Sequence, residues 1–337
     1  MYKEPFFSII LPVYNVKKYL NRCVDKLLCE KFRDFEIILV DDGSTDGCYN
    51  ICDEYMKKDS RISVIHKENG GLSSARNEGF KIAKGKYIFW LDSDDYIVQD
   101  ALNILYNYLQ DDNIDIIKYN FIKQPASMPE YSILKEGLYN KDEICNGVLK
   151  LAIENTGRFI WSVWSHIYRR KFLEQNNLSF VSEREIGSED YLFNLQSYLR
   201  AKNILVIKEA LYNYDLRIGS LTNRYRWNLM NQYLKLYNLM CNEIVQSHNN
   251  QLMESLYNFY VWNGYHVLMT NEMRITEKHK PKDRNQNIRE LLKQESFSNA
   301  LKEIKINKLS MSQVIIYSFM KLHLWYMLIA LMKIRKR

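Results

Sequence analysis

The sequence predicts an α/β protein in which a mainly parallel sheet is flanked by helices and followed by a mostly helical C-terminal region. Three observations indicate this fold class. Short apolar segments alternate with amphipathic ones over about the first 95 residues, a pattern typical of βαβ units. Polar or acidic residues follow three of the expected strands directly, at the edge where such sheets bind ligands. From about residue 225, the pattern becomes helical and rich in Tyr and Asn.

Four strands and the helices between them account for the first part of the chain. Each expected strand is short and continuously apolar, as in a sheet that is buried on both faces. The expected helices repeat their apolar residues every three or four positions. The strands are expected at 6–13, 35–40, 62–65 and 86–91, and the helices at 17–30, 46–58 and 73–83.

The later elements are spaced less regularly. Residues 124–140 contain Pro125 and Pro129, so we expect a loop region there. Further strands are expected at 114–121, 204–207 and 210–214. Further helices are expected at 141–153, from 187 onward, and at 225–246, 250–272, 285–293 and 297–304. A linker is expected at 278–283. The expected domains are a sheet domain at 1–222, a helical domain at 223–310 and a tail helix at 311–337.

The composition is that of a folded globular chain, since 47% of its 337 residues are hydrophobic and 26% are charged. The net charge of +7 indicates contact with phosphates or a membrane surface, and it does not indicate a nucleic-acid-binding stripe. Six scattered cysteines without a CxxC pair favour a reducing compartment. The N-terminus leads directly into a strand and shows no signal peptide, so we expect a cytoplasmic location.

An acidic run closes the fourth expected strand. The apolar segment Tyr87–Leu91 is followed at once by Asp92, Ser93, Asp94 and Asp95. Alternation along a strand end places Asp92 and Asp94 on the same side. Two carboxylates arranged in this way suit a hard divalent cation such as Mg²⁺ or Mn²⁺. The alternative is a polar turn in which Asp94 or Asp95 caps the next helix.

The loops after the first two strands exclude two common classes of nucleotide-binding protein. No GxxxxGK[ST] or GxGxxG segment is present, and the first strand ends in Pro12-Val13-Tyr14-Asn15. P-loop nucleoside triphosphatases and dinucleotide-binding dehydrogenases are therefore not expected. Asp41 and Asp42 end the second strand, where a carboxylate can accept hydrogen bonds from a nucleobase or a ribose. In that segment, helix capping by Ser44, Thr45 or Asp46 is the alternative.

Four segments in this order resemble the family 2 glycosyltransferases, which have the GT-A fold. They are Ser8-Ile9-Ile10-Leu11-Pro12-Val13-Tyr14-Asn15, Val40-Asp41-Asp42-Gly43-Ser44-Thr45-Asp46-Gly47, Asn69-Gly70-Gly71-Leu72-Ser73-Ser74-Ala75-Arg76-Asn77 and Leu91-Asp92-Ser93-Asp94-Asp95. A looser likeness to the bacterial capsule and surface-polysaccharide branch extends the resemblance over about residues 5–222.

The resemblance implies a UDP-sugar donor and assigns residues to it. Tyr14 would stack on the base, and one of Asp41 and Asp42 would hold the base or ribose. Arg76 would face the nucleotide from the loop that opens the third helix, and the alternative is an ordinary salt bridge on a helix face. Asp92 would meet the ribose or the water shell of the metal, and Asp94 would ligate Mn²⁺ or Mg²⁺ at the diphosphate. The implied donor-binding residues are Pro12, Val13, Tyr14, Asn15, Asp41, Asp42, Arg76, Asp92, Ser93 and Arg217.

The resemblance also implies a catalytic base and a stereochemical outcome. Asp190 matches the base position of the family, with Glu189 beside it, and a base opposite the leaving group predicts inversion. The alternative is that both carboxylates only favour a helix N-terminus. Trp161 and Trp164 would stack on acceptor sugars or form a buried aromatic core. Arg217 would close over the diphosphate or lie in a plain turn.

The tail at 311–332 is strongly apolar and ends in Lys-Ile-Arg-Lys-Arg. Lys321 and His323 interrupt it, which makes a membrane-spanning helix awkward. An amphipathic helix on a membrane surface fits this pattern. The alternatives are a helix that closes the core of the C-terminal domain or one that forms a homodimer contact.

These observations predict a metal-dependent, inverting glycosyltransferase that moves one sugar from a UDP-sugar to a glycan acceptor. A lipid-linked saccharide at the inner face of the cell membrane suits the basic, apolar tail, and no nucleic-acid partner is expected. Alternatives are a sugar-phosphate nucleotidyltransferase, an inactive relative that binds glycans or acts as a scaffold, and a transferase acting on a glycoprotein glycan. The sequence does not name the transferred sugar.

Overall fold

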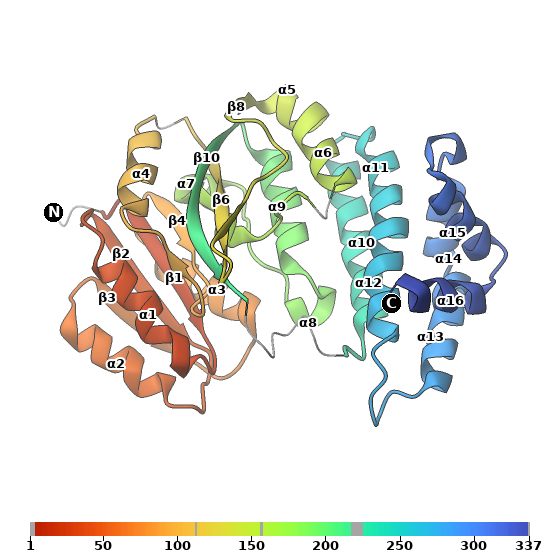
Figure 1. The fold of residues 1–337 in the computed structure, drawn as a ribbon. Coiled ribbons are helices and arrows are strands. Elements are labelled where there is room, and N and C mark those ends of the chain that lie inside the picture. Colours follow the sequence, from red (N-terminus) through yellow and green to blue (C-terminus); the bar gives the residue numbers. More distant parts are fainter. Residues whose placement is uncertain (1–3, 112, 156–157, 217–224, 336–337) are drawn as a thin grey trace. The chain divides into compact units, whose positions relative to one another are not determined.

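The computed structural model describes residues 4–335 except 112, 156–157 and 217–224. The chain forms two compact units. Unit 1 comprises residues 1–149 and 157–216, and unit 2 comprises 150–156 and 217–337 (Figure 1). The sequence placed its first boundary at 222, within the segment that is not described, and it did not anticipate that 150–156 belong with the helical unit.

The sheet of unit 1 begins with the four predicted parallel strands. They are β1 (Phe7–Val13), β2 (Phe35–Asp41), β3 (Ile62–His66) and β4 (Tyr87–Trp90), and they lie in the order β3-β2-β1-β4. Their connections run through α1 (Lys17–Leu28), α2 (Cys48–Lys58) and α3 (Leu72–Ile82). All residues of β1 and β4 are buried, as the continuous apolar pattern of these strands predicts.

Beyond β4 the sheet becomes mixed. β9 (His166–Arg169) lies antiparallel to both β4 and β6 (Ile116–Gln124), and β10 (Asn203–Asp215) lies parallel to β6. β10 is one long strand with register shifts, where the sequence indicated two shorter strands. Three short strands complete the sheet at its edges: β5 (Tyr96–Ile97), β7 (Met128–Glu130) and β8 (Gly137–Asn140). The predicted α/β fold class with flanking helices is confirmed.

The helix α3 packs unusually close to the sheet. A Cβ atom added at Gly79 would lie 2.4 Å from Cγ2 of Ile10 on β1 and 3.1 Å from Cγ2 of Val40 on β2. Only a residue without a side chain permits this approach. The close packing fixes the height of α3 above the strands, and α3 carries Arg76.

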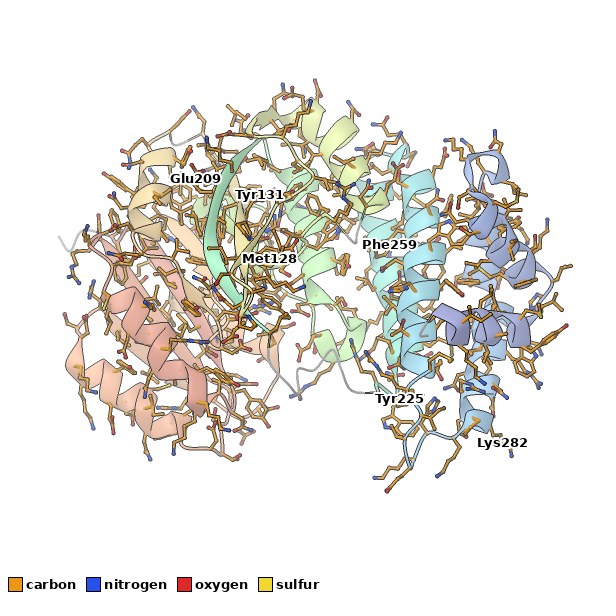
Figure 2. All side chains as sticks on the ribbon, in the orientation of Figure 1. Met128, Tyr131, Glu209, Tyr225, Phe259 and Lys282 are labelled. Atoms are coloured by element: carbon orange, nitrogen blue, oxygen red, sulfur yellow. The ribbon has the colours of Figure 1, made fainter. Side chains whose placement is uncertain are left out.

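The remaining helices of unit 1 surround the later strands. The predicted helix at 141–153 is present as a continuous helical segment, with one π-type turn in its middle. The elements of unit 1 are α4 (Ala101–Tyr108), α5 (Lys141–Glu143), η1 (Ile144–Val148), η2 (Val163–Ser165), α7 (Arg170–Gln175), α8 (Glu183–Ile186) and α9 (Glu189–Arg200). The helical segment continues from η1 into α6 (Leu149–Glu154), which belongs to unit 2 from Lys150 onward. Figure 2 shows Met128 and Tyr131 on and beside β7, where both side chains are exposed.

Unit 2 is helical, as the sequence predicts. Its apolar side chains form a core that includes Leu236, Met240 and Leu256. Pro281 occupies the first turn of a helix, so the predicted linker at 278–283 is partly helical. The elements are α10 (Leu229–Gln246), α11 (Leu252–Asn258), η4 (Phe259–Asn263), α12 (Gly264–Glu272), α13 (Pro281–Lys293), α14 (Glu295–Lys302), η5 (Ile306–Lys308), α15 (Met311–Lys321) and α16 (Trp325–Arg335).

The apolar tail folds into two helices where one was expected. α15 and α16 are separated at His323, which has a positive φ of 54°. Each helix buries one face within unit 2 and leaves other apolar side chains, such as Met311 and Leu322, exposed. Among the described residues, none of the helices has the length and hydropathy needed to cross a bilayer.

Candidate active site

The acidic run after β4 alternates between two environments. Asp92 and Asp94 are partly exposed, whereas Ser93 and Asp95 are buried. The Ser93 hydroxyl donates a hydrogen bond to the carbonyl oxygen of Pro12 at 2.6 Å. The structure therefore gives Asp92 and Asp94 the shared accessible side that strand alternation predicts.

Asp95 ties the same turn to β10 and does not cap a helix. Its carboxylate accepts hydrogen bonds from the hydroxyl of Tyr212 at 2.7 Å and from the backbone N–H of Asp215 at 2.8 Å. Burial, together with the nearby charges of Asp94 and Asp92, raises the pKa of Asp95 to about 8. The start of α4 is held by a different carboxylate, that of Glu30.

Arg76 joins the strand end to the start of α9. Its guanidinium lies 3.0 Å from Asp92 Oδ1, 2.8 Å from Glu189 Oε1 and 3.0 Å from Asp190 Oδ1. Only 1% of the Arg76 side chain is exposed. Burial acts to lower the pKa of Arg76, but the three carboxylates outweigh it and raise this pKa, so the side chain remains a cation.

The position of Arg76 differs from the sequence expectation in one respect. We expected it on the loop that opens the third helix, but it lies inside α3, in the second turn. The helix turns it away from the surface and toward the carboxylates of two other segments. Arg76 is therefore placed to hold Asp92 and Asp190 near each other. A direct contact with the nucleotide stays a prediction.

The N-terminus of α3 is held by a carboxylate from a distant part of the sequence. Glu183 accepts hydrogen bonds from the backbone N–H groups of Leu72 at 3.2 Å and Ser73 at 3.1 Å. Gly71 precedes them with a φ of +94°, and a Cβ atom there would lie 2.1 Å from Oε1 of Glu183. The negative charge of Glu183 also interacts favourably with the positive end of the α3 helix dipole. These contacts fix the helix that positions Arg76.

Asp190 lies in the first turn of α9, and 20% of its side chain is exposed. Burial, then the charges of Glu189 and Asp92, raise the pKa of Asp190, while Arg76 and the backbone N–H of Val163 act to lower it. A carboxylate in such a setting is a stronger base than an ordinary one and is still open to a ligand. This is the chemistry expected of a general base.

Buried polar side chains hold the segment that brings the Val163 N–H to Asp190. Lys118 donates to the carbonyl of Ile160 at 2.7 Å, and His166 donates from Nδ1 to the carbonyl of Ser162 at 3.0 Å. Asn194 and Tyr119 donate to the carbonyls of Trp161 and Trp164. Burial lowers the pKa values of Lys118 and His166. Each carbonyl in this segment thus has a fixed partner.

The two Trp side chains are buried, with 4% of Trp161 and 6% of Trp164 exposed. The Trp164 ring stacks on Tyr212, with 4.4 Å between ring centroids, and Trp161 packs against Phe159 at 4.9 Å. Neither ring presents a free face to an acceptor sugar. Of the two alternatives that the sequence left open, the structure favours the buried aromatic core.

Asp41 and Asp42 are both buried and already hold protein groups. Asp42 accepts hydrogen bonds from Lys67 at 2.6 Å and from the backbone N–H groups of Gly70 at 2.9 Å and Gly71 at 2.8 Å. Asp41 lies 3.0 Å from Nδ1 of His66. In the structure these carboxylates shape the loops beside the strand ends, and their contact with a base or ribose stays a prediction.

The loop after β1 leaves an aromatic ring exposed. Pro12 and Val13 are buried, whereas half of Tyr14 is accessible. Asn15 has a positive φ of 52°, and its side-chain oxygen accepts a hydrogen bond from Thr45 N at 2.8 Å. This contact joins the loops after β1 and β2, so Tyr14 stands beside the residues that were predicted to bind the nucleotide.

The alternative of helix capping after β2 holds for one residue. Asp46 accepts hydrogen bonds from the backbone N–H groups of Cys48 at 3.1 Å and Lys17 at 2.8 Å, at the starts of α2 and α1. Ser44 and Thr45 contact Asn15. Arg217, predicted to close over the diphosphate, lies outside the described residues.

Asp92 and Asp94 fit a hard divalent cation, although the described part of the chain holds no group of three metal-binding side chains. Mg²⁺ in phosphate-transfer and related sites is bound by one or two carboxylates, with substrate phosphates and water completing its six ligands. Two partly exposed carboxylates at a strand end match that donor set. Mn²⁺ prefers the same oxygen ligands.

Sequence reasoning missed two residues that organise the site. Arg22 donates to the backbone oxygen of Asp94 at 2.8 Å, pairs with Asp215 at 2.8 Å, and lies over the Tyr96 ring at 4.5 Å. Glu183 holds the start of α3. Arg22 lies in the amphipathic helix α1 and Glu183 at the start of the short polar helix α8. No local sequence pattern distinguishes either residue from a solvated surface charge.

Comparison with known proteins identifies related chains. The family model described as Glycosyl transferase family 2 matches residues 8–176. The uncharacterized glycosyltransferase EpsJ of Bacillus subtilis is 40% identical over 221 residues, which cover 65% of this chain and 63% of EpsJ. The putative glycosyltransferase EpsH of the same organism is 30% identical over 253 residues, which cover 75% of this chain and 72% of EpsH.

The solved structure of residues 1–349 of Staphylococcus aureus TarS with UDP-GlcNAc is similar in fold. The TM-score is 0.72 at 23% identity, and the match covers 96% of this chain and 90% of the TarS chain. At this identity the likeness concerns the fold. It includes the sheet with its flanking helices and the helical C-terminal region.

Proposed function

This chain belongs to glycosyl transferase family 2 and is a glycosyltransferase, and on that premise we propose that it transfers a single sugar from a UDP-sugar to a saccharide acceptor with inversion at the anomeric carbon. Asp190 is the general base in this proposal, and Asp92 and Asp94 hold Mn²⁺ or Mg²⁺ at the diphosphate.

One observation carries the proposal: a single buried guanidinium joins Asp92 and Asp190. Arg76 lies 3.0 Å from a carboxylate oxygen of each. Asp92 and Asp190 are far apart in the sequence, yet both lie at the carboxyl edge of the sheet, where ligands of α/β proteins bind. The strand-end carboxylate that we propose as a metal ligand and the carboxylate that we propose as the base thus contact the same guanidinium, and the pKa of the second is raised.

The donor side of the proposal rests on the loops around β1, β2 and β4. The exposed ring of Tyr14 supplies a stacking surface for the uracil. Asp92 and Asp94 are accessible to a cation, which when bound neutralises charge on the departing diphosphate. The complex of TarS with UDP-GlcNAc supports a UDP-sugar as the donor class.

The acceptor side rests on Asp190. Its carboxylate takes the proton of the attacking hydroxyl while that oxygen forms its bond to the anomeric carbon and the bond to the diphosphate breaks. Val163 N–H and Arg76 orient the carboxylate. A base on the face opposite the leaving group gives one displacement, so an α-linked donor yields a β-linked product.

The acceptor that we propose is a lipid-linked saccharide of a surface polysaccharide, at the inner face of the cell membrane. The relative TarS is named a poly(ribitol-phosphate) β-N-acetylglucosaminyltransferase, which supports a cell-surface polymer as acceptor class. Exposed Met311, Ile315, Leu322 and Tyr326 on the tail helices supply apolar contacts for a membrane surface, next to the basic Lys321.

UDP release from a panel of UDP-sugars, with Mn²⁺ and with a chelator, tests the proposal. We expect metal-dependent release that saccharide acceptors stimulate. Asp190→Asn should reduce the stimulated rate by about 10²–10⁴-fold, the usual contribution of a general base, while UDP binding persists. Asp94→Asn should abolish the metal dependence. Asp111→Asn, a change of an exposed loop carboxylate, is the matched control and should behave as the parent.

Two outcomes would contradict the proposal. If Asp190→Asn and Asp94→Asn release UDP as fast as the parent, the site is assigned wrongly. If the parent binds UDP but releases none from any donor with any acceptor, the alternative of a glycan-binding relative without activity is favoured.

A further inference from the structure

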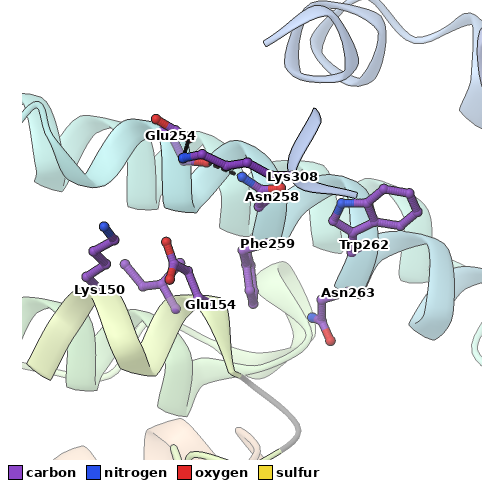
Figure 3. A pocket seen from close by; sticks show the side chains of 9 residues that line it. Lys150, Glu154, Glu254, Asn258, Phe259, Trp262, Asn263 and Lys308 are labelled. Carbon is purple, nitrogen blue, oxygen red and sulfur yellow. Dashed lines mark hydrogen bonds and ion pairs between the residues drawn. The ribbon is translucent and has the colours of Figure 1, made fainter. Parts of the chain in front are cut away.

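Unit 2 contains a pocket of about 320 Å³ that the catalytic proposal does not use. One side is formed by α6, with Lys150 and Glu154, and the other by the end of α11 and by η4 (Figure 3). Asn258, Phe259, Trp262 and Asn263 line that second side. The volume falls at the small end of the range of small-molecule sites, which begins at about 300 Å³.

Several polar atoms in the pocket have open hydrogen-bonding positions. The indole nitrogen of Trp262 is buried and has no partner within the described residues. Each of three other side chains uses one polar atom: Glu154 accepts from Ser255 at 2.8 Å, Asn258 donates to the Glu254 backbone at 2.9 Å, and Asn263 donates to Tyr233 at 3.0 Å. The second oxygen of Glu154 and the amide oxygens of Asn258 and Asn263 remain as acceptors for a ligand.

The indole N–H of Trp262 faces the pocket region without a protein partner. A buried donor without a partner destabilises the folded state. Figure 3 shows Trp262 on the same helical segment as Asn258 and Asn263, at the rim of the pocket. A hydroxyl or carbonyl oxygen of a ligand would give the N–H of Trp262 a partner.

The backbone at the pocket is irregular in a way that often accompanies function. Phe259, Trp262 and Asn263 all lie in η4, a π-helical segment inserted between α11 and α12. Single π turns within α-helices recur at functional sites. Here the inserted π turn brings the side chains of Phe259, Trp262 and Asn263 to the same cavity. A regular α-helix would point these three side chains in different directions.

The charges of the lining do not favour an anion. Lys308 lies 2.8 Å from Glu254, which also pairs with Lys305 at 2.5 Å. Lys150 and Glu154, on α6, have opposite charges. The lining thus combines hydrogen-bond donors and acceptors with aromatic surface, and its two lysines and two glutamates balance in charge. Hydroxyl groups both donate and accept, and the C–H faces of sugar rings pack on aromatic rings, so this combination suits an uncharged saccharide.

We infer that this pocket binds one or two sugar units of the glycan that the enzyme extends. The inference rests on the proposed function for its choice of ligand, and it assigns unit 2 a glycan-binding site separate from the strand-end carboxylates. Trp262 donates to a ring or hydroxyl oxygen, Asn258 and Glu154 accept from hydroxyls, and Phe259 lies against the apolar side of the ligand.

The indole N–H signals of this 337-residue chain in ¹H–¹⁵N NMR spectra provide the test. Trp262→Phe assigns the Trp262 signal and keeps an aromatic ring while removing the donor. Chitotriose and cellotriose serve as uncharged probes, and inorganic phosphate serves as the anionic one. We expect the Trp262 signal to shift on titration with at least one trisaccharide, and the Trp262→Phe variant to bind that saccharide at least 10-fold more weakly.

Trp227→Phe is the matched control, because Trp227 also lies in unit 2 and is 63% exposed. This variant should bind the saccharide as the parent does. If no trisaccharide moves the Trp262 signal, or if phosphate alone moves it, the inference is wrong. UDP release from the donor alone separates the two proposals, since Trp262→Phe should leave it unchanged. If the parent binds neither trisaccharide but releases UDP as expected, only the inference about the pocket is contradicted.

Discussion

Replacement of Arg76 by Met tests whether this residue organises the site. Arg76 contributes the only cation described in contact with Asp92, Glu189 and Asp190, at 2.8–3.0 Å. Its removal leaves three carboxylates facing a space that an apolar side chain now fills. Breaking a buried ion pair from one side typically costs about 3–5 kcal/mol.

The expected loss of unfolding free energy lies at the lower end of that range, about 3 kcal/mol. The carboxylates retain between 10% and 26% exposure, so water can partly solvate them once Arg76 is gone. Arg76→Lys should cost less, because the ammonium keeps the charge, although it cannot form the planar fork of a guanidinium. Lys81→Met, on the exposed side of the same helix, should cost less than about 0.5 kcal/mol.

The unfolding free energy lost in Arg76→Met should also depend on pH, and the direction of this dependence follows from the pKa of Asp190. Its folded pKa is already raised, so its contribution to stability is fully present below the unfolded pKa and is lost as the pH rises through the folded pKa. Arg76 acts to lower the folded pKa, and its removal raises it further. The difference between Arg76→Met and the parent should therefore be larger at about pH 9 than at about pH 6.

Urea unfolding gives the free energies, and hydrogen exchange of the peptide covering α3 assigns the transition to unit 1. A two-unit chain need not unfold in one step, so this assignment is required. A loss below 1 kcal/mol, or one that is larger at the acidic pH, would refute the reasoning.

Three further predictions concern the base and the position of α3. Glu189→Gln should move the acid limb of the pH–rate profile to lower pH, because removing a neighbouring negative charge lowers the pKa of Asp190; an unmoved limb would contradict this. Gly79→Ala should lower the free energy of unfolding by about 1–3 kcal/mol through overpacking, and shortening Ile10 to Ala as well should restore part of this loss. Gly147→Ala, whose added Cβ would meet open space, is the control and should cause no measurable loss in urea unfolding. Glu183→Ala should destabilise the start of α3 by about 1–2 kcal/mol and increase the rate of hydrogen exchange there. Equal exchange rates in the variant and the parent would contradict the role of Glu183 in holding the start of α3.

The first four strands and their helices follow from the sequence because each is specified by local periodicity. The apolar segments at β1 and β4 are buried on both faces, and such strands can only lie inside a sheet covered by helices. The shared accessible side of Asp92 and Asp94 likewise follows from alternation along a single strand. These features depend on neighbours in the chain.

The second half of the sheet and much of the site depend on distant contacts. β9 lies antiparallel between β4 and β6, and nothing in the sequence His166–Arg169 states which strands it joins. The network of Arg76 with Glu189 and Asp190 spans more than 110 positions. In the tail, the break at His323 arises because α15 and α16 pack on different parts of unit 2. The apolar content of the sequence alone does not predict this packing.

The configuration of the new glycosidic bond tests the central claim most directly. In the mechanism that we propose, an acceptor hydroxyl activated by Asp190 attacks from the side opposite the diphosphate and displaces it in one step. We predict that NMR spectroscopy of the first product formed from an α-linked UDP-sugar will show a β-linkage. An α-linked product would contradict the account, because it requires two displacements or attack from the same side as the departing UDP.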